Sequence, residues 1–232
     1  MKYAFINGKI LNGKRDMTVV EGQCILTDGE TITDVLPVEG VNTDGYRVID
    51  LAGRYIMPGL INMHVHLAGN GKPQKKQRDN AKLVKTILGN PLTRAIAYKM
   101  VGDFAKDELF GGVTTIRTVG GIADFDTRLR DEIAAGRKVG PRILAANRGI
   151  SVPGGHMAGS VAIAAHDTEE ALAHLAVCRK ENVDLVKLMI TGGVLDAKEK
   201  GVPGELKMSP EMVKAVCERA HQAGYTVAAH VE

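Results

Sequence analysis

Residues 60–67 read LINMHVHL, an apolar run that ends in two histidines. From this point the chain alternates short apolar runs with longer helix-like segments. The expected strands cover residues 60–67, 112–119, 141–147, 183–190 and 225–231. Strands that alternate with helices predict right-handed βαβ units and a parallel sheet. Five strands are more than half of a (β/α)8 barrel, so the sequence predicts an α/β fold with an incomplete TIM-like barrel.

The segments between these strands carry the residues that begin and end helices. Ser209-Pro210 is typical of a helix start, and Gly136 and Gly224 are typical of helix ends. The long segment contains Asn90-Pro91, which predicts a break into two helices. The expected helices cover residues 80–110, 124–135, 168–181 and 209–223.

Residues 1–57 have a different sequence pattern, in which short β-like runs are separated by Gly, Asn and Asp. Asn7-Gly8 and Asp28-Gly29 are turn signals. We therefore expect a small antiparallel sheet that forms a domain of its own over residues 1–57. The barrel domain is expected to cover residues 58–232.

The bulk composition excludes several functional classes. The 232 residues are 44% hydrophobic and 25% charged, which is typical of a globular protein, and the net charge of +3 favours neither nucleic acid nor membrane. The start has no apolar signal segment, and three widely spaced cysteines suggest neither a disulfide framework nor a cysteine metal site. We therefore expect a cytoplasmic protein. Signatures for phosphate-binding loops and for serine hydrolysis are absent.

His64 and His66 lie at the carboxyl end of the first expected strand, where barrel enzymes build their active sites. The spacing of two places both imidazoles on one face of the strand, so that they could grip one divalent ion. The alternative is a pair of histidines that make ordinary hydrogen bonds. A metal site is the favoured interpretation of this pair, because other possible metal ligands lie at the same carboxyl ends of the expected strands.

Lys187 and His230 are those residues, near the ends of the fourth and fifth strands. A buried lysine has a lowered pKa, and its free amine can add carbon dioxide to form a carbamate that bridges two metals. The alternative for Lys187 is an ion pair, and for His230 a hydrogen bond at the rim.

Four further residues are candidates for substrate binding. His156 lies in a Gly-rich loop after the third strand, and Arg117, Asn147 and Arg148 lie near the ends of the second and third. An arginine or amide there could hold a carboxylate or a carbonyl. Each could equally be a surface or salt-bridging residue.

With these residues in place, the chain resembles the amidohydrolase superfamily, in the branch of imidazolonepropionase-like enzymes and Xaa-Pro dipeptidases. The resemblance is carried by MPGLINMHVHL, GGVTTIRTVGG, GPRILAANRGISVPGGHMAG, VDLVKLMITGGV and GYTVAAHVE. It implies a distorted barrel with a small β-sandwich assembled from both chain ends. It also implies a dinuclear zinc site with His64, His66 and His230 as ligands, a carbamylated Lys187 as the bridge, and His156 facing the substrate.

The resemblance also implies residues that this chain does not contain: a histidine after strand six and an aspartate after strand eight. We expect the N-terminal part of a hydrolase that cleaves an amide bond, in a dipeptide or N-acyl amino acid, through metal-bound hydroxide. An alternative is a cyclic-amide hydrolase of the imidazolonepropionase type, although Lys187 favours two metals. Another alternative is a catalytically inert chain, either a truncated reading frame or one half of a split protein that needs a C-terminal partner. The expected protein partner is a complementary C-terminal half or another copy of this chain.

Overall fold

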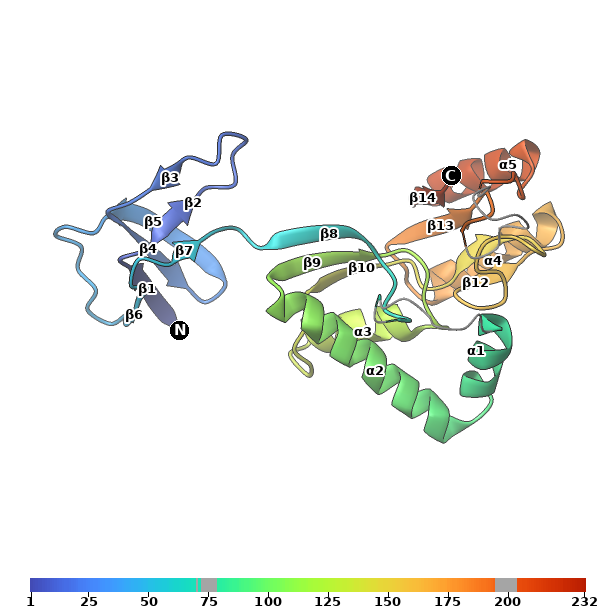
Figure 1. The fold of residues 1–232 in the computed structure, drawn as a ribbon, viewed down its shortest axis with the longest axis horizontal. Coiled ribbons are helices and arrows are strands. Elements are labelled where there is room, and N and C mark those ends of the chain that lie inside the picture. The colour runs from blue at the N-terminus through green and yellow to red at the C-terminus, as the bar shows by residue number, and fades with distance from the viewer. Residues whose placement is uncertain (70, 72–78, 195–203) are drawn as a thin grey trace. The chain divides into compact units, whose positions relative to one another are not determined.

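The computed structural model describes residues 1–69, 71, 79–194 and 204–232 (Figure 1). The chain divides into two compact units, Met1–Gly59 and Leu60–Glu232. Each has its own sheets and its own buried apolar cluster.

The N-terminal unit is built from seven short strands in two sheets, in the orders β5-β4-β1-β6 and β3-β2-β7. The expected purely antiparallel sheet is wrong, because β1 pairs with β6 and β2 pairs with β7 in parallel. After β1 the chain turns at Asn7, with φ of +56°, and enters the second sheet instead of folding back as a hairpin. Asp28-Gly29 does join an antiparallel hairpin, β4 with β5. The strands are β1 (Lys2–Ile6), β2 (Lys9–Leu11), β3 (Val19–Val20), β4 (Gln23–Asp28), β5 (Thr31–Pro37), β6 (Arg47–Asp50) and β7 (Tyr55–Ile56).

The second unit is an α/β structure whose paired strands are all parallel. One sheet has the order β10-β9-β8 and the other β12-β11-β13-β14. The third expected strand ends early: β10 stops at Ala145 and pairs with β9, and a separate strand, β11, begins at Gly149 and pairs with β13. The sequence did not predict β11 and β12, which lie where a loop was expected. The strands are β8 (Leu60–Val65), β9 (Val113–Thr118), β10 (Arg142–Ala145), β11 (Gly149–Ser151), β12 (Ala162–Ala164), β13 (Leu185–Met189) and β14 (Thr226–His230).

The helices follow the expected segments closely. Asn90 caps the second helix through its side-chain oxygen, and Ser209 caps the fifth. The fourth helix is capped by Asp167, whose carboxylate accepts from Glu170 N, where the sequence suggested a start at Thr168. The helices are α1 (Asn80–Leu88), α2 (Pro91–Phe110), α3 (Phe125–Ala134), α4 (Thr168–Lys180) and α5 (Pro210–Gln222).

The buried apolar clusters show which face of each strand packs on helices and which face is left for the candidate site residues. One cluster packs Val65 and Ile116 against α2 and α3, and another packs Val186 and Leu188 against α4 and α5. Because side chains alternate along a strand, Lys187 must point to the face opposite those helices. A third cluster, which includes Val119, Ala146 and Leu185, joins the residues that follow β9 and β10 to the start of β13.

Apolar side chains also remain exposed on the first strand and helix of this unit. On β8, Leu60, Ile61 and Met63 are each about half exposed or more, and on α2 the same holds for Leu92 and Phe110. β8 pairs on one side alone, with β9, in the described part of the chain. Its other edge therefore has unused backbone hydrogen-bonding groups. Across the described residues, no helix combines the length and apolar character needed to cross a membrane.

Candidate active site

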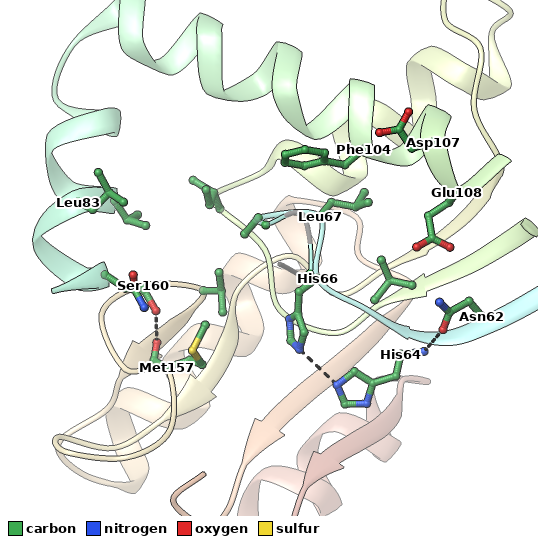
Figure 2. A pocket seen from close by; sticks show the side chains of 18 of the residues that line it. Asn62, His64, His66, Leu67, Leu83, Phe104, Asp107, Glu108, Met157 and Ser160 are labelled. Atoms are coloured by element: carbon green, nitrogen blue, oxygen red, sulfur yellow. Dashed lines mark hydrogen bonds between the residues drawn. The ribbon is translucent and has the colours of Figure 1, made fainter. Parts of the chain in front are cut away.

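His64 and His66 meet at the carboxyl end of β8. Their Nε2 atoms are 3.2 Å apart, and their ring planes lie at 64° (Figure 2). His66 Nδ1 lies 3.1 Å from the carbonyl oxygen of Gly120, which follows β9. Since a carbonyl oxygen only accepts, Nδ1 carries the proton and Nε2 presents its lone pair toward His64.

Both imidazoles favour the neutral form, which is the form that binds metals. Burial lowers the pKa of His64, and the positive charge of Lys187 lowers it further. Burial likewise lowers the pKa of His66, although the hydrogen bond to Gly120 opposes the change. The sequence predicted this pair on one strand face, and the structure brings their nitrogens together.

Lys187 is the third residue of β13 and is only 2% exposed. Burial, with a smaller contribution from the charge of Arg117, lowers the pKa of its amine to about 8. Among the described residues no carboxylate lies within ion-pairing distance of its amine, so the ion-pair alternative has no partner there. A buried amine without a counter-charge is poised to react or to bind.

His230 ends β14 and stacks against His156, with ring centroids 4.1 Å apart and planes at 14°. Strand register pairs Lys187 with Ala228, so His230 lies on the same face two residues nearer the carboxyl end. Burial lowers the pKa of His230, and the neighbouring His156 lowers it further. The structure therefore places His156 beside a candidate ligand.

The backbone of Gly193 packs against both rings. A Cβ atom at this position would lie 2.5 Å from His156 Nδ1 and 3.2 Å from His230 Nε2. The loop after β13 thus presses its backbone against the histidine pair, an approach open to glycine alone.

Arg117 also reaches this part of the molecule. It lies on β9 one residue before the end of the strand, and its Nε donates to the carbonyl oxygen of Met63 at 2.8 Å. The positive charge of Arg117 lowers the pKa of Lys187, so the guanidinium acts on the same group of residues. The other nitrogens of its guanidinium make no hydrogen bond to described residues.

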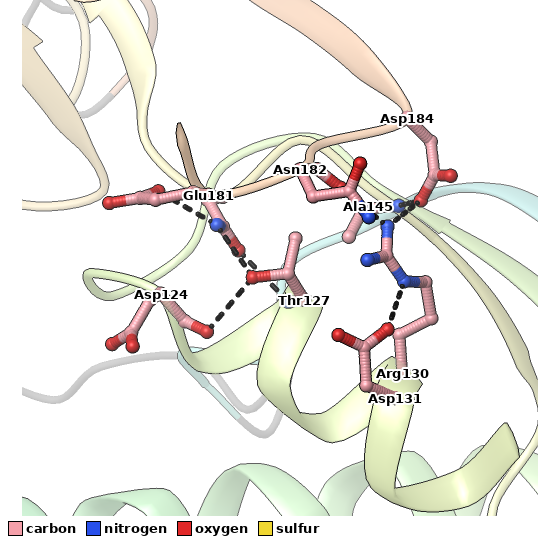
Figure 3. Close-up of polar contacts among 9 residues, drawn as sticks. Asp124, Thr127, Arg130, Asp131, Ala145, Glu181, Asn182 and Asp184 are labelled. Carbon is pink, nitrogen blue, oxygen red and sulfur yellow. Dashed lines mark hydrogen bonds and ion pairs between the residues drawn. The ribbon is translucent and has the colours of Figure 1, made fainter. Parts of the chain in front are cut away.

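The side chains of Asn147 and Arg148 contact Glu181 and are not brought together with the two histidine pairs. Asn147 is 1% exposed; its side chain accepts from Thr127 N and donates to Glu181 Oε2 at 2.8 Å. Arg148 lies 3.5 Å from the same carboxylate of Glu181. Figure 3 shows Thr127 and Glu181 in this network, which ties the start of α3 to the end of α4. Asn147 has φ of +52°, so the chain turns away from the strand there.

A cavity of about 730 Å³ opens beside His64 and His66. Leu83 of α1, Phe104 of α2 and Met157 of the loop before β12 lie around it, and Figure 2 shows them on the side of His66. Lys187 and His230 do not line it. The cavity therefore meets one end of the candidate site and offers room for an apolar group there.

Two further buried polar side chains, Asp126 and His174, lie on helices and were not among the residues expected at the site. Asp126, in the first turn of α3, is 1% exposed, and His174 of α4 is 6% exposed, with Nε2 3.3 Å from the carbonyl oxygen of Arg148. An acid in the first turn is a common helix-start feature, so no sequence signal singled out Asp126.

The donor atoms suit a borderline ion such as zinc. Imidazole nitrogens prefer zinc to magnesium or calcium, which take oxygen ligands. No group of three or more His, Cys, Asp or Glu side chains in the described part of the chain is arranged to hold a metal. The described donors are the pair His64 and His66, the stacked pair His156 and His230, and Lys187, which shares a strand face with His230, and these fit part of a metal site.

The sequence profile of the Amidohydrolase family matches residues 55–232, which include every residue of this site. The chain belongs to the amidohydrolase family. A prolidase described as putative, from Bifidobacterium longum, has a solved structure that is 32% identical, with a TM-score of 0.75 over 99% of this chain and 49% of that one. A solved Xaa-Pro dipeptidase with bound methionine is 28% identical, with a TM-score of 0.78 over 100% and 57%.

A curated relative is the dihydroorotase of Bacillus cytotoxicus, 29% identical over 144 residues, which are 55% of this chain and 32% of that protein. The chain thus spans about half the length of these related amidohydrolase structures and matches about a third of this curated relative. Amidohydrolases are hydrolases that act on carbon–nitrogen bonds, and the parallel α/β unit agrees with their barrel fold.

Proposed function

We propose that the complete protein is a metal-dependent amidohydrolase that cleaves the amide bond of a dipeptide or an N-acyl amino acid. The observation that carries the proposal is the joint placement of His64, His66 and Lys187. The two Nε2 atoms face each other at 3.2 Å, and the charge of the buried Lys187 amine acts on both imidazoles. This arrangement offers lone pairs to a cation from more than one strand.

His64 and His66 would hold one zinc ion, and His230 would hold a second with Lys187 between them. When bound, zinc would polarise the amide carbonyl and lower the pKa of water at the site. The neutral Lys187 amine can add carbon dioxide: its nitrogen forms a bond to the carbon, one proton leaves, and a carbamate anion remains. The pKa of about 8 leaves part of the amine unprotonated near neutral pH, as this addition requires.

His156 and Arg117 are the groups we assign to substrate. His156 stacks on His230, so a molecule beside that ligand would touch the His156 ring. Arg117 has guanidinium nitrogens beyond the Nε that binds Met63, and they could bind a carboxylate. The resemblance to a prolidase and to a Xaa-Pro dipeptidase favours a dipeptide as that carboxylate-bearing substrate.

A cyclic amide is the second candidate substrate, and the resemblance to dihydroorotase favours it. Both substrates pass through attack on an amide carbonyl, so the same residues would serve. A further part of the proposal concerns the barrel: residues outside this chain, or another chain, complete its eight strands. The exposed apolar side chains on β8 and α2 support this, because they would be buried in a complete barrel. On this proposal, residues 1–57 form part of a β-sandwich and residues 58–232 the first five βα units.

The proposal is tested on the complete protein by elemental metal analysis and by intact and peptide mass spectrometry. We expect zinc to be present, a carbon-dioxide adduct on Lys187, and hydrolysis of dipeptides that end in proline. His64→Ala and Lys187→Ala should each lower bound metal, whereas Lys99→Ala, at an exposed ion pair on α2, should not. A protein with no divalent metal and an unmodified Lys187 would contradict the mechanism. Cleavage of dihydroorotate but not of dipeptides would select the second candidate.

A further inference from the structure

Asp126 is an acidic side chain buried at the start of α3 without a regular hydrogen-bonding partner. It is 1% exposed, and Asp124 takes the N-cap position, so Asp126 does not cap the helix. Its Oδ2 atom and the Thr118 hydroxyl at the end of β9 are both buried and lack a well-aligned hydrogen bond, although the hydroxyl is near enough to the carboxyl to oppose the rise of its pKa. Burial of a carboxyl group without well-aligned hydrogen bonds costs free energy of folding, so we expect the contacts of Asp126 to have a role that compensates for this cost.

The carboxyl lies flat against the backbone of Gly121. A Cβ atom built on Gly121 would overlap Asp126 Oδ2 and would lie 2.8 Å from Cγ and 2.9 Å from Oδ1. Real side chains do not approach so closely, so Gly121 has to be glycine while Asp126 is present. Any larger residue would shift either α3 or the turn that follows β9.

That turn holds His66. The peptide unit between Gly120 and Gly121 has two hydrogen bonds: its carbonyl oxygen accepts from His66 Nδ1 at 3.1 Å, and its N–H donates to the carbonyl oxygen of Asn147 at 2.8 Å. Gly120 has φ of +140°, and a Cβ there would lie 3.1 Å from the His66 ring. A single peptide plane therefore fixes both the tautomer and the tilt of the ring.

The start of α3 is anchored to the same turn by a second route. The Asn147 side chain accepts from Thr127 N at 3.0 Å, while the Asn147 backbone carbonyl binds Gly121 N. Asp126, next to Thr127, is thus held at a fixed distance from Gly121. The carboxyl fills the space behind the peptide plane and keeps it from rotating away from His66.

We propose that Asp126 is a positioning residue for His66, which acts by packing against Gly121 and so holds the Gly120 carbonyl oxygen on His66 Nδ1. This inference rests on the proposed function, in which His66 is a metal ligand. Groups that orient metal-binding histidines in this way are worth about 10- to 100-fold in metal affinity. Asp126 never touches the ligand itself, so its effect must pass through the turn.

If Asp126 acts through its packing and not through its charge, substitutions at this position should differ in their effects. Asp126→Asn keeps the shape of the carboxyl, so His66 should keep its hydrogen bond and metal affinity should stay within about threefold of wild type. Asp126→Ala leaves the turn unsupported, and we expect a loss of about tenfold. Gly121→Ala should be as harmful, because its Cβ meets Asp126. In the double variant Gly121→Ala with Asp126→Ala the new methyl group occupies the vacated space, and the affinity should return to the level of Asp126→Ala or better.

The test uses the complete protein with ¹⁵N-labelled histidine, and two measurements. Nuclear magnetic resonance reports whether His66 Nδ1 is protonated and hydrogen-bonded, assigned by loss of the signal in His66→Asn. Zinc affinity is measured by competition with a chelator. Asp131→Asn is the matched control, because Asp131 is an acid on the same helix that is largely exposed and paired with Arg130. It should change neither measurement.

The two proposals fail in different ways. If the wild type binds no zinc, the proposed metal function is contradicted, while the His66 signal still decides the role of Asp126. The positioning role is overturned if Gly121→Ala or Asp126→Ala leaves the His66 Nδ1 signal at its wild-type position, or if the double variant shows the sum of the two single losses. If Asp126→Ala does not fold, Gly121→Ala and Asp126→Asn decide the question in the same way.

Discussion

The rings of His156 and His230 are stacked 4.1 Å apart, and the backbone of Gly193 lies against both. This contact joins the loop after β11 to the end of β14 through the loop after β13. The position of a candidate substrate group is therefore coupled to the position of a candidate metal ligand.

We expect Gly193→Ala to lower kcat/KM of the complete enzyme by about 100-fold, because the new Cβ must displace the stacked pair. Gly192→Ala is the matched control: a Cβ there would lie 3.4 Å from Cε of Lys207 and 3.8 Å from the carbonyl oxygen of Glu205, which are ordinary contacts. Steady-state kinetics of the two variants check the prediction. Equal activities would show that the stacked arrangement has no part in the reaction.

We expect Lys187→Met to stabilise the protein while abolishing its activity. Methionine fills a similar volume and removes a buried amine that has no counter-charge among the described residues. Replacement of buried ion pairs by apolar side chains of similar volume is often neutral or stabilising by about 1–4 kcal/mol, and we expect a gain in that range for the unpaired amine. Chemical denaturation of the metal-free protein at pH 7 measures the change, with Lys99→Met as an exposed control. A variant less stable than wild type would mean that the amine has a stabilising partner.

Asp126 predicts a specific dependence of stability on pH. Burial raises the pKa of its carboxyl from 3.8 to about 6, although the Thr118 hydroxyl opposes the rise. Below pH 4 the folded and unfolded chains both hold the proton. Between pH 4 and 6 the unfolded chain releases it first, so the free energy of unfolding falls as pH rises, by about 3 kcal/mol in all.

Asp126→Asn cannot lose this proton, so its stability relative to wild type should increase between pH 4 and 6 and then stay level. Urea unfolding of both proteins at several pH values gives this difference directly, and other titrating groups cancel in it. A difference that does not change with pH would show that the carboxyl keeps its ordinary pKa in the folded protein.

Asn147 should contribute to stability and not to substrate binding. Asn147→Ala removes hydrogen bonds to Thr127 and Glu181, and alanine tolerates the left-handed φ of +52° less well than asparagine, so we expect a loss of about 3 kcal/mol. Asn147→Gly should recover about 1 kcal/mol, because glycine tolerates that backbone conformation. KM should change less than twofold in either variant. A tenfold rise in KM at unchanged stability would contradict this prediction and show that Asn147 binds the substrate.

Local patterns in the sequence predicted most of the fold of the second unit. The apolar run around Lys187 and the caps at Asn90 and Ser209 predicted strand and helix positions closely, because these signals act over a few neighbouring residues. Alternation along a strand also predicted that His64 and His66 share a face. Sequence failed where pairing is non-local: it missed the parallel pairs of the first unit and the strand β11, which pairs with β13.

The sequence by itself determined that the chain alternates strands and helices, and that histidines and a lysine fall near the ends of its strands. The tertiary structure alone decided which of these side chains meet. It turned Asn147 and Arg148 toward Glu181, stacked His156 on His230, and buried Asp126 behind the turn that holds His66. Such contacts join residues far apart in the chain through packing and backbone turns, and no local pattern encodes them.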